Sequence, residues 1–343
     1  MAISLLPGRL SPLFQVLIFL CCVKPASAAE MKFGWPVACI PSQTCWIVNY
    51  VDDGPSKTSA RDFQCGDMTY PGHDGTDIAI KDHKTIEDNI NVLAAADGTV
   101  LRIRDSVEDG KGETSVMNAS REAKKECGNG VIITHENGWE TIYCHMKKGS
   151  ISVSPGQHVH TGDRLGSVGQ SGLAEFPHLH FGVKHDNRTI DPFTGLPPEE
   201  GCGIKNTISL WNTPIAYDPL MPYAAGFSDQ LPDNVLLVND TSSPPHITAT
   251  VPLMTFWILF YGAEPDDRLI MKILDPDGKV YAQNDSILKQ KKIRLMKYIG
   301  ARIKDKPLHP GTYAGQAILL RELPDGQILR RSIESTVIVD APH

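Results

Sequence analysis

The chain has 343 residues, 41% of them hydrophobic and 21% charged, and its formal net charge is −7 at pH 7. This acidic balance argues against a nucleic-acid-binding protein, which would need a surplus of lysine and arginine. The length exceeds that of one ordinary domain, so we expect two domains.

Residues 1–28 have the pattern of a secretory signal peptide. Arg9 precedes an apolar run over 10–23, and Ala26-Ser27-Ala28 supplies the small residues of a cleavage site. The run is interrupted by Pro12 and is too short to favour a membrane-spanning helix. We therefore expect an exported protein with no stable membrane anchor after cleavage. Retention in a periplasm is favoured over secretion, because no wall-binding repeat or sorting signal is visible.

Six of the eight cysteines remain once the predicted signal peptide, with Cys21 and Cys22, is removed. An even number in an exported protein favours disulfide bonds, although six cysteines allow fifteen pairings. Three of the six lie within residues 29–69, which predicts a disulfide-stapled extension. The alternatives are that residues 32–70 form a groove wall or an inhibitory flap. The six are Cys39, Cys45, Cys65, Cys127, Cys144 and Cys202.

The first cluster with metal-binding chemistry is Gly72-His73-Asp74-Gly75-Thr76-Asp77. Its two glycines permit a tight backbone that aims His73 and Asp77 at one point, just before a predicted strand at 78–80. Zinc accepts nitrogen from histidine and oxygen from aspartate, so these two side chains are candidate ligands.

Turn residues recur every 8 to 12 positions along the chain and helical periodicity is nearly absent, which predicts an all-β protein. Residues 105–126 interrupt this pattern with a polar, charged stretch. We predict a long surface loop there, and such loops commonly form the wall or lid of a site.

A β-hairpin is predicted over residues 130–145, because Asn137-Gly138 separates two alternating runs. A two-residue turn would place Val131 opposite Cys144 and His145 at the far end of the second strand.

Two further features surround this hairpin. A disulfide between Cys127 and Cys144 is sterically plausible, although the sequence alone leaves the connectivity open. His135-Glu136 begins like the helical His-Glu-x-x-His zinc signature, but the second histidine is missing and Asn137-Gly138 is a turn.

Two histidines complete a possible zinc site. His178 and His180 lie two positions apart on a predicted strand, so both side chains point to the same face. A catalytic zinc site uses three protein ligands and leaves the fourth position to water. The candidate ligands are therefore His73, Asp77 and one of His178 and His180, and the remaining imidazole is free for proton transfer or charge stabilisation.

A second His-x-His pair, His158-Val159-His160, lies in a glycine-flanked turn without a nearby carboxylate motif. We interpret it as a polar surface turn.

The last part of the chain predicts a linker and a second domain. Residues 196–245 are proline-rich and irregular, whereas residues 246–343 alternate in short runs typical of a small Ig-like β-sandwich. Within the latter, 251–261 predicts a buried strand. The basic stretch 289–297 predicts a lysine-protected edge strand, with a ligand-binding face as the alternative.

Four stretches follow one another with a characteristic order and spacing. They are Gly72-His73-x-Gly75-x-Asp77, the hairpin from Gly130 to His145, Gly156-Gln157-x-Val159-x-x-Gly162-Asp163, and Pro177-His178-Leu179-His180-Phe181. Together they resemble the lysostaphin-type (LytM-like) zinc metallopeptidases of bacterial cell walls.

This resemblance covers roughly residues 70–192 and implies a zinc metallopeptidase domain over 70–195. The implied fold is an antiparallel β-sheet with a groove, of the lipoyl-like hybrid-barrel type. By position, the resemblance assigns one zinc ion to His73, Asp77 and His180, and catalysis to His145 and His178. The sequence departs from the family at 81–91, at Cys144 and at Glu175-Phe176, which bears on the width of the groove.

The implied function is hydrolysis of peptidoglycan stem-peptide cross-links or cross-bridges by metal-activated water. One alternative is an inactive wall-binding regulator of another hydrolase. The other is an exported protease of protein substrates.

Overall fold

The computed structural model describes residues 1–2, 31–56, 59–110, 114–233, 238–302 and 308–341. All but the first two residues of the predicted signal peptide lie outside these ranges. Within them, no helix is long and apolar enough to cross a membrane. The described chain is nearly all β, as the sequence predicts.

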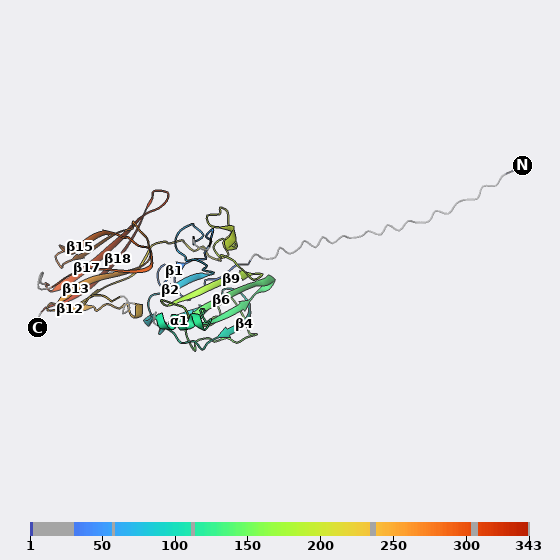
Figure 1. Ribbon diagram of the computed structural model, residues 1–343, viewed down its shortest axis with the longest axis horizontal. Coiled ribbons are helices and arrows are strands. Elements are labelled where there is room, and N and C mark those ends of the chain that lie inside the picture. The colour runs from blue at the N-terminus through green and yellow to red at the C-terminus, as the bar shows by residue number, and fades with distance from the viewer. Residues whose placement is uncertain (3–30, 57–58, 111–113, 234–237, 303–307, 342–343) are drawn as a thin grey trace. The chain divides into compact units, whose positions relative to one another are not determined.

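An antiparallel sheet of eight strands forms the first part of the fold (Figure 1). Its strands lie in the order β1-β2-β9-β6-β5-β4-β7, and β10 pairs with β9. They are β1 (Cys45–Asn49), β2 (Thr76–Ile80), β4 (Gly98–Arg104), β5 (Asn129–Thr134), β6 (Trp139–Met146), β7 (His158–Val159), β9 (His178–His185) and β10 (Arg188–Thr189). A separate pair is formed by β3 (Asn91–Leu93) and β8 (Arg164–Ser167), and short 3-10 helices are η1 (Lys84–Ile86), η2 (Glu136–Gly138) and η3 (Pro198–Glu200).

Side chains along β2 and β9 alternate between the face of the sheet that packs in the core and the face that carries the histidines. Ile78 on β2 and Leu179 and Phe181 on β9 are fully buried. Since neighbouring side chains on a strand point to opposite faces, His178 and His180 project together from the other face of the sheet.

The second part of the fold is a β-sandwich. Its three-stranded sheet has the order β11-β13-β16 and its five-stranded sheet the order β12-β18-β17-β14-β15. The strands are β11 (Met221–Ser228), β12 (His246–Thr248), β13 (Leu253–Ala263), β14 (Arg268–Leu274), β15 (Val280–Ile287), β16 (Lys292–Arg302), β17 (Gly311–Glu322) and β18 (Ile328–Asp340). A shared apolar core includes Phe256, Ile258, Phe260, Leu269 and Tyr313.

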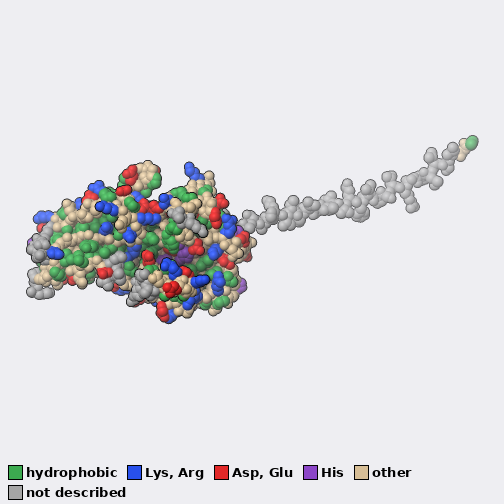
Figure 2. Space-filling view, viewed as in Figure 1, with side chains coloured by type: hydrophobic (Ala, Val, Ile, Leu, Met, Phe, Trp, Pro, Cys, Tyr) green, Lys and Arg blue, Asp and Glu red, His purple; other side chains and the backbone are tan. Residues whose placement is uncertain are grey.

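Two predictions for this part are confirmed. The stretch 251–261 falls largely on β13, where ten of the eleven residues are buried. The basic stretch 289–297 leads into β16, which lies at the edge of its sheet. Figure 2 shows lysine and arginine side chains interspersed with acidic ones on the face in view.

The predicted hairpin forms, but its predicted register is wrong by one residue. Val131 lies opposite Tyr143 and not Cys144. Asn137 and Gly138 both have positive φ, and together with Glu136 they form a three-residue loop, η2, in place of a two-residue turn. The extra loop residue shifts the ladder, because strand alternation alone does not determine loop length.

Two other predictions need correction. The polar stretch 105–126 is not a continuous loop, since it contains the helix α1 (Thr114–Glu122). Its few apolar residues hid the helical period from the sequence. The predicted linker 196–245 is wrong at β11, which pairs with β13 and belongs to the second sheet. The other domain boundaries stay predictions.

The cysteine-containing extension is part of the fold. β1 pairs with β2 and so extends the main sheet. The six cysteines form three disulfides, Cys39–Cys45, Cys65–Cys202 and Cys127–Cys144. The bridge between Cys127 and Cys144, plausible from the sequence, is therefore present.

A buried pair of carboxyl groups also joins the extension to the chain after β10. Asp53 and Asp191 are 2% and 0% exposed, and one oxygen of each has no other hydrogen-bond donor. Burial and the neighbouring Asp191 raise the pKa of Asp53 to about 9. The folded pair therefore holds a proton at neutral pH.

This pair predicts a stability that depends on pH. The unfolded carboxyls release their protons near pH 4, so the stabilisation is complete below about pH 4 and is lost as the pH rises through about 9. Asp53→Asn should reduce the slope of the free energy of unfolding against pH by about 1 kcal/mol per pH unit. Urea unfolding between about pH 5 and 8 measures this slope. Asp186→Asn, at an exposed carboxyl, is the control, and an unchanged slope in Asp53→Asn would contradict the shared proton.

Candidate metal centre

Pairing of β2 with β9 brings the two sequence clusters together. Asp77 lies opposite His180 and Ala79 opposite His178. The loop before β2 also has to admit the His180 ring, since a Cβ at Gly75 would lie 2.6 Å from it. A side chain at position 75 would therefore displace His180, which explains the need for glycine there.

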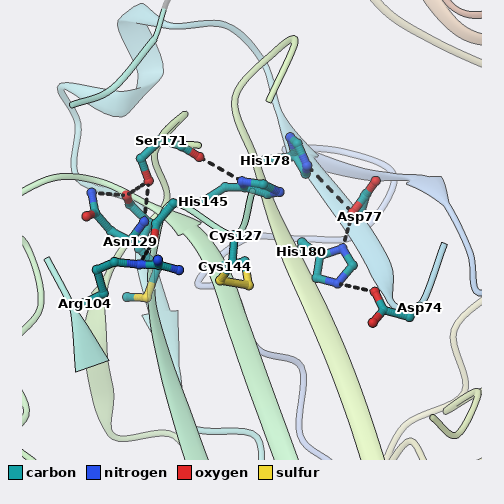
Figure 3. The surroundings of a disulfide bond; sticks show 12 residues. Asp74, Asp77, Arg104, Cys127, Asn129, Cys144, His145, Ser171, His178 and His180 are labelled. Atoms are coloured by element: carbon teal, nitrogen blue, oxygen red, sulfur yellow. Dashed lines mark hydrogen bonds and ion pairs between the residues drawn. A yellow bond between two sulfur atoms is a disulfide. The ribbon is translucent and has the colours of Figure 1, made fainter. Parts of the chain in front are cut away.

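Three ligand atoms converge at the start of β2. His73 Nε2 lies 3.1 Å from Asp77 Oδ1 and 3.2 Å from His180 Nδ1, and the same Asp77 oxygen lies 3.0 Å from His180 Nδ1. His73 and Asp77 are buried, while His180 is partly buried, and Figure 3 shows the His180 ring between Asp77 and Asp74. Within the described part of the chain, this is the one group of three or more such side chains that could hold a metal ion.

Neighbouring groups orient each of these three side chains. His73 Nδ1 donates to the Tyr50 carbonyl at 2.7 Å, which leaves Nε2 as the ligand atom. His180 Nε2 faces Asp74 Oδ1 at 3.4 Å, which leaves Nδ1. Asn49 Nδ2 donates to Asp77 Oδ2 at 2.9 Å, which leaves Oδ1. Such outer contacts set the tautomer and direction of metal ligands.

The charges of this group favour a bound cation. Burial alone would raise the pKa of Asp77, but the nearby His73, His178 and His180 hold it well below its usual range. Burial would lower the pKa of His180, whereas hydrogen bonds to Asp74 and Asp77 raise it to about 10. The carboxylate therefore stays ionised, and the three converging acceptors suit a metal ion, which would take the place of the shared protons.

Two more imidazoles lie beside the three ligand atoms. The rings of His145 and His178 are 4.6 Å apart between centroids, and His145 lies 6.1 Å from His180. His178 Nε2 is 3.7 Å from Asp77 Oδ1. The five predicted site residues are thus brought together by β2, β6, β9 and the loop before β2.

Burial favours the neutral form of both of these imidazoles, and each uses Nδ1 for a backbone carbonyl. His145 Nδ1 donates to the Ser171 carbonyl and His178 Nδ1 to the Phe176 carbonyl, each at 2.8 Å. Burial lowers the pKa of both histidines, and for His145 the neighbouring His178 and His180 lower it further, to well below the usual value. A neutral imidazole with a free Nε2 is suited to accept a proton.

A cleft of about 710 Å³ runs across the sheet beside these residues. Its lining includes His145 and His180, together with Tyr70, Asp74, Arg102 and other side chains of β4, β5 and β6. The ring of Tyr70 also packs with its centroid 4.5 Å from that of His73. Of the segment 32–70, for which the sequence left a groove wall as an alternative, Tyr70 therefore lines this cleft.

The sequence did not identify Asn49 or Asp74 as partners of the ligands. Asn49 reaches Asp77 through the pairing of β1 with β2, which no local pattern reveals. His158 and His160 are exposed, as predicted, but the prediction of a turn is wrong at His158-Val159, which forms the short strand β7 paired with β4.

Residues 71–192 match the model of Peptidase family M23. These residues form an M23 peptidase domain. The match agrees with the resemblance to lysostaphin-type peptidases, which belong to the same family.

Several known proteins are similar to this domain. An uncharacterized metalloprotease of Haemophilus influenzae is 26% identical over 129 residues, covering 36% of this chain and 23% of that protein. The peptidoglycan DD-endopeptidase ShyA of Vibrio cholerae is 44% identical over 54 residues, covering 16% of this chain and 12% of that protein. The catalytic domain of lysostaphin from Staphylococcus simulans is 20% identical with a TM-score of 0.26, covering 36% of this chain and 77% of that one. The chain thus spans less than a quarter of these two curated relatives.

The hydrogen bond from Asn49 predicts a measurable contribution to metal affinity. Asn49→Ala should weaken metal binding by about 10- to 100-fold, because Asp77 loses the donor that orients it. Competition with a chelator of known affinity measures this change. Asn187→Ala, in the exposed turn before β10, is the control, and equal affinities of the two variants would contradict a role for Asn49.

Proposed function

We propose that this M23 domain is a zinc-dependent endopeptidase that hydrolyses peptide cross-links of peptidoglycan. The observation that carries the proposal is the convergence of His73 Nε2, Asp77 Oδ1 and His180 Nδ1 beside two further imidazoles. Three ligands with an open side toward a cleft are the arrangement of a hydrolytic metal site.

The donor set suits zinc, since two histidine nitrogens and one carboxylate oxygen are ligands that zinc prefers in catalytic sites. When bound, zinc supplies a Lewis acid that lowers the pKa of a coordinated water and polarises a carbonyl. His73, Asp77 and His180 would hold it, with Tyr50, Asn49 and Asp74 fixing their orientation.

His145 and His178 move the protons of the reaction. Each has its Nδ1 bound to a backbone carbonyl, so each exchanges protons through Nε2. One takes the proton of the attacking water, and a protonated imidazole then delivers a proton to the leaving amine. An imidazolium next to the scissile bond also stabilises the negative charge that develops on the carbonyl oxygen.

The cleft fits an extended peptide. It runs over β4, β5 and β6, offers Ile103, Ile132 and Ile142 as apolar contacts, and places Arg102 and Asp74 among its charged groups. The similarity to a protein named peptidoglycan DD-endopeptidase supports stem peptides or cross-bridges as the substrate. We also propose export to a periplasm, which the three disulfides support because they require an oxidising compartment.

A digestion experiment tests this function against its two alternatives. The mature protein, loaded with zinc, is incubated separately with purified peptidoglycan and with a denatured protein, and the fragments are identified by mass spectrometry. We expect cross-linked muropeptides to be cleaved and the denatured protein to stay intact. Cleavage of the protein alone supports a general protease, and cleavage of neither supports an inactive regulator.

A further inference from the structure

The disulfide between Cys127 and Cys144 lies in the cleft, directly beside His145. Cys144 precedes His145 on β6, and all three residues line the cleft. Figure 3 shows the disulfide near both His145 and His180, and Cys144 is the cross-strand partner of His180. The other two disulfides contribute no residue to this cleft.

The backbone of His145 departs from the regular strand. Its φ is 62°, a left-handed conformation that is uncommon for residues other than glycine. The pairing of β5 with β6 is interrupted at the same place, between Asn129 and Val131. The His145 amide donates instead to the Cys127 carbonyl at 2.8 Å. Cys127 thus holds His145 through this hydrogen bond and, through the disulfide, holds the residue before it.

The segment after Cys127 also holds the acceptor of the His145 ring. His145 Nδ1 donates to the Ser171 carbonyl, and the Asn129 amide donates to Ser171 Oγ at 2.8 Å. Gly128 packs so closely on this segment that a Cβ there would lie 2.4 Å from the Ser171 carbonyl oxygen. Both the backbone and the ring of His145 therefore depend on where residues 127–129 lie.

We propose that the Cys127–Cys144 disulfide is a positioning element for His145, required for turnover and not for metal binding. The inference rests on the proposed peptidase function, since it assigns His145 a proton-transfer role there. A strained backbone at a site persists only where surrounding contacts hold it, and the disulfide is the covalent one among them. The three metal ligands come from β2, β9 and the loop before β2. Cys144 is the neighbour of His180 through the backbone pairing of β6 with β9, and that pairing does not require the bond between the sulfurs.

A double-mutant cycle tests the coupling between the disulfide and His145. Cys127→Ser with Cys144→Ser should lower kcat about 10- to 100-fold, as expected for a misplaced catalytic group, with KM changed less than about twofold. His145→Ala should lower kcat about 10³-fold. Adding the two cysteine changes to His145→Ala should then cost less than about twofold more. Losses that multiply in the triple variant would overturn the proposal.

The matched control removes a different disulfide. Cys65→Ser with Cys202→Ser opens a bridge of sequence separation 137, against 17 for Cys127–Cys144. Chain entropy predicts that the longer loop contributes more stability, so this control should lose at least as much thermal stability. It should nevertheless keep kcat within about twofold. If kcat falls in proportion to thermal stability in both double-cysteine variants, the disulfide acts through stability, and its role in positioning His145 is contradicted.

A second measurement does not require activity. In the metal-free protein, ¹⁵N NMR of the histidine rings should show His145 with a protected Nδ1 hydrogen, and this signal should disappear in the Cys127→Ser/Cys144→Ser variant. Should that variant fail to fold, Cys127→Ala/Cys144→Ala replaces it in both experiments. An unchanged ring signal overturns the proposal. If the signal is lost but the wild-type protein cleaves no peptidoglycan, the positioning stands and the proposed function fails.

Discussion

Replacing His145 with alanine is expected to lower kcat/KM on peptidoglycan about 10³-fold while one metal ion stays bound per chain. The loss follows from the removal of a neutral imidazole whose Nε2 is free for proton transfer, a contribution that is typically 10²- to 10⁴-fold. Metal binding is retained because His145 is not among the three converging ligands. Rates of muropeptide release and metal content by atomic absorption measure the two quantities on the same sample.

The control for this prediction is His160→Ala. His160 belongs to the second His-x-His pair, but its side chain is 81% exposed and pairs with Asp97. We expect full activity from this variant. Wild-type activity in His145→Ala would remove His145 from the mechanism, whereas loss of metal from it would show that the variant disturbs the ligands instead.

The sequence correctly predicted that His145 lies near the far end of the second hairpin strand, but the register that it predicted for the hairpin is wrong. Alternation on either side of Asn137-Gly138 identifies two paired strands, because such a pattern buries one face. It carries no information on whether the loop has two residues or three. The bulge near Gly130 is equally invisible, since it depends on the Cys127 carbonyl reaching the His145 amide.

The ligand residues were predictable because the chemistry is concentrated in short motifs. His73 and Asp77 lie four residues apart, and His178 and His180 two apart, so local geometry already aims each pair. The sequence predicted that the two motifs share one site because together they supply the three ligands of a catalytic zinc ion, and only the choice of His180 over His178 followed from the family resemblance. The antiparallel pairing of β2 with β9 is the physical cause of their meeting.

The partners of the ligands could not be predicted in the same way. Asn49 lies 28 residues before Asp77, and the two meet only because β1 joins the edge of the sheet. Tyr50, Ser171 and Phe176 act through backbone carbonyls, for which any residue type would serve. Asp74 was visible within the first motif, and its position next to His73 is the signal that could have identified it.

Asp77→Ala is expected to abolish both metal binding and hydrolysis. The carboxylate supplies Oδ1 to the ligand group, contacts His73 and His180, and accepts the Asn49 amide. Its removal leaves two histidines, which no longer form a three-ligand site. We expect metal affinity to fall by well over the roughly 100-fold that an outer contact contributes, and activity to fall to that of metal-free protein. Isothermal titration of the metal-free variant with zinc measures the first change and muropeptide release the second.

Asp74→Asn is the control, because it changes a residue that only contacts a metal ligand, whereas Asp77→Ala removes a ligand. Asp74 touches the same histidine, His180, but through Nε2 on the side away from the other ligands. An amide there still accepts that hydrogen bond, so we expect metal affinity to fall by no more than about 10-fold and activity to persist at saturating zinc. If Asp77→Ala binds zinc as tightly as Asp74→Asn, the metal does not lie between His73, Asp77 and His180. Hydrolysis by Asp77→Ala at the wild-type rate would likewise show that the peptidase reaction does not need this centre.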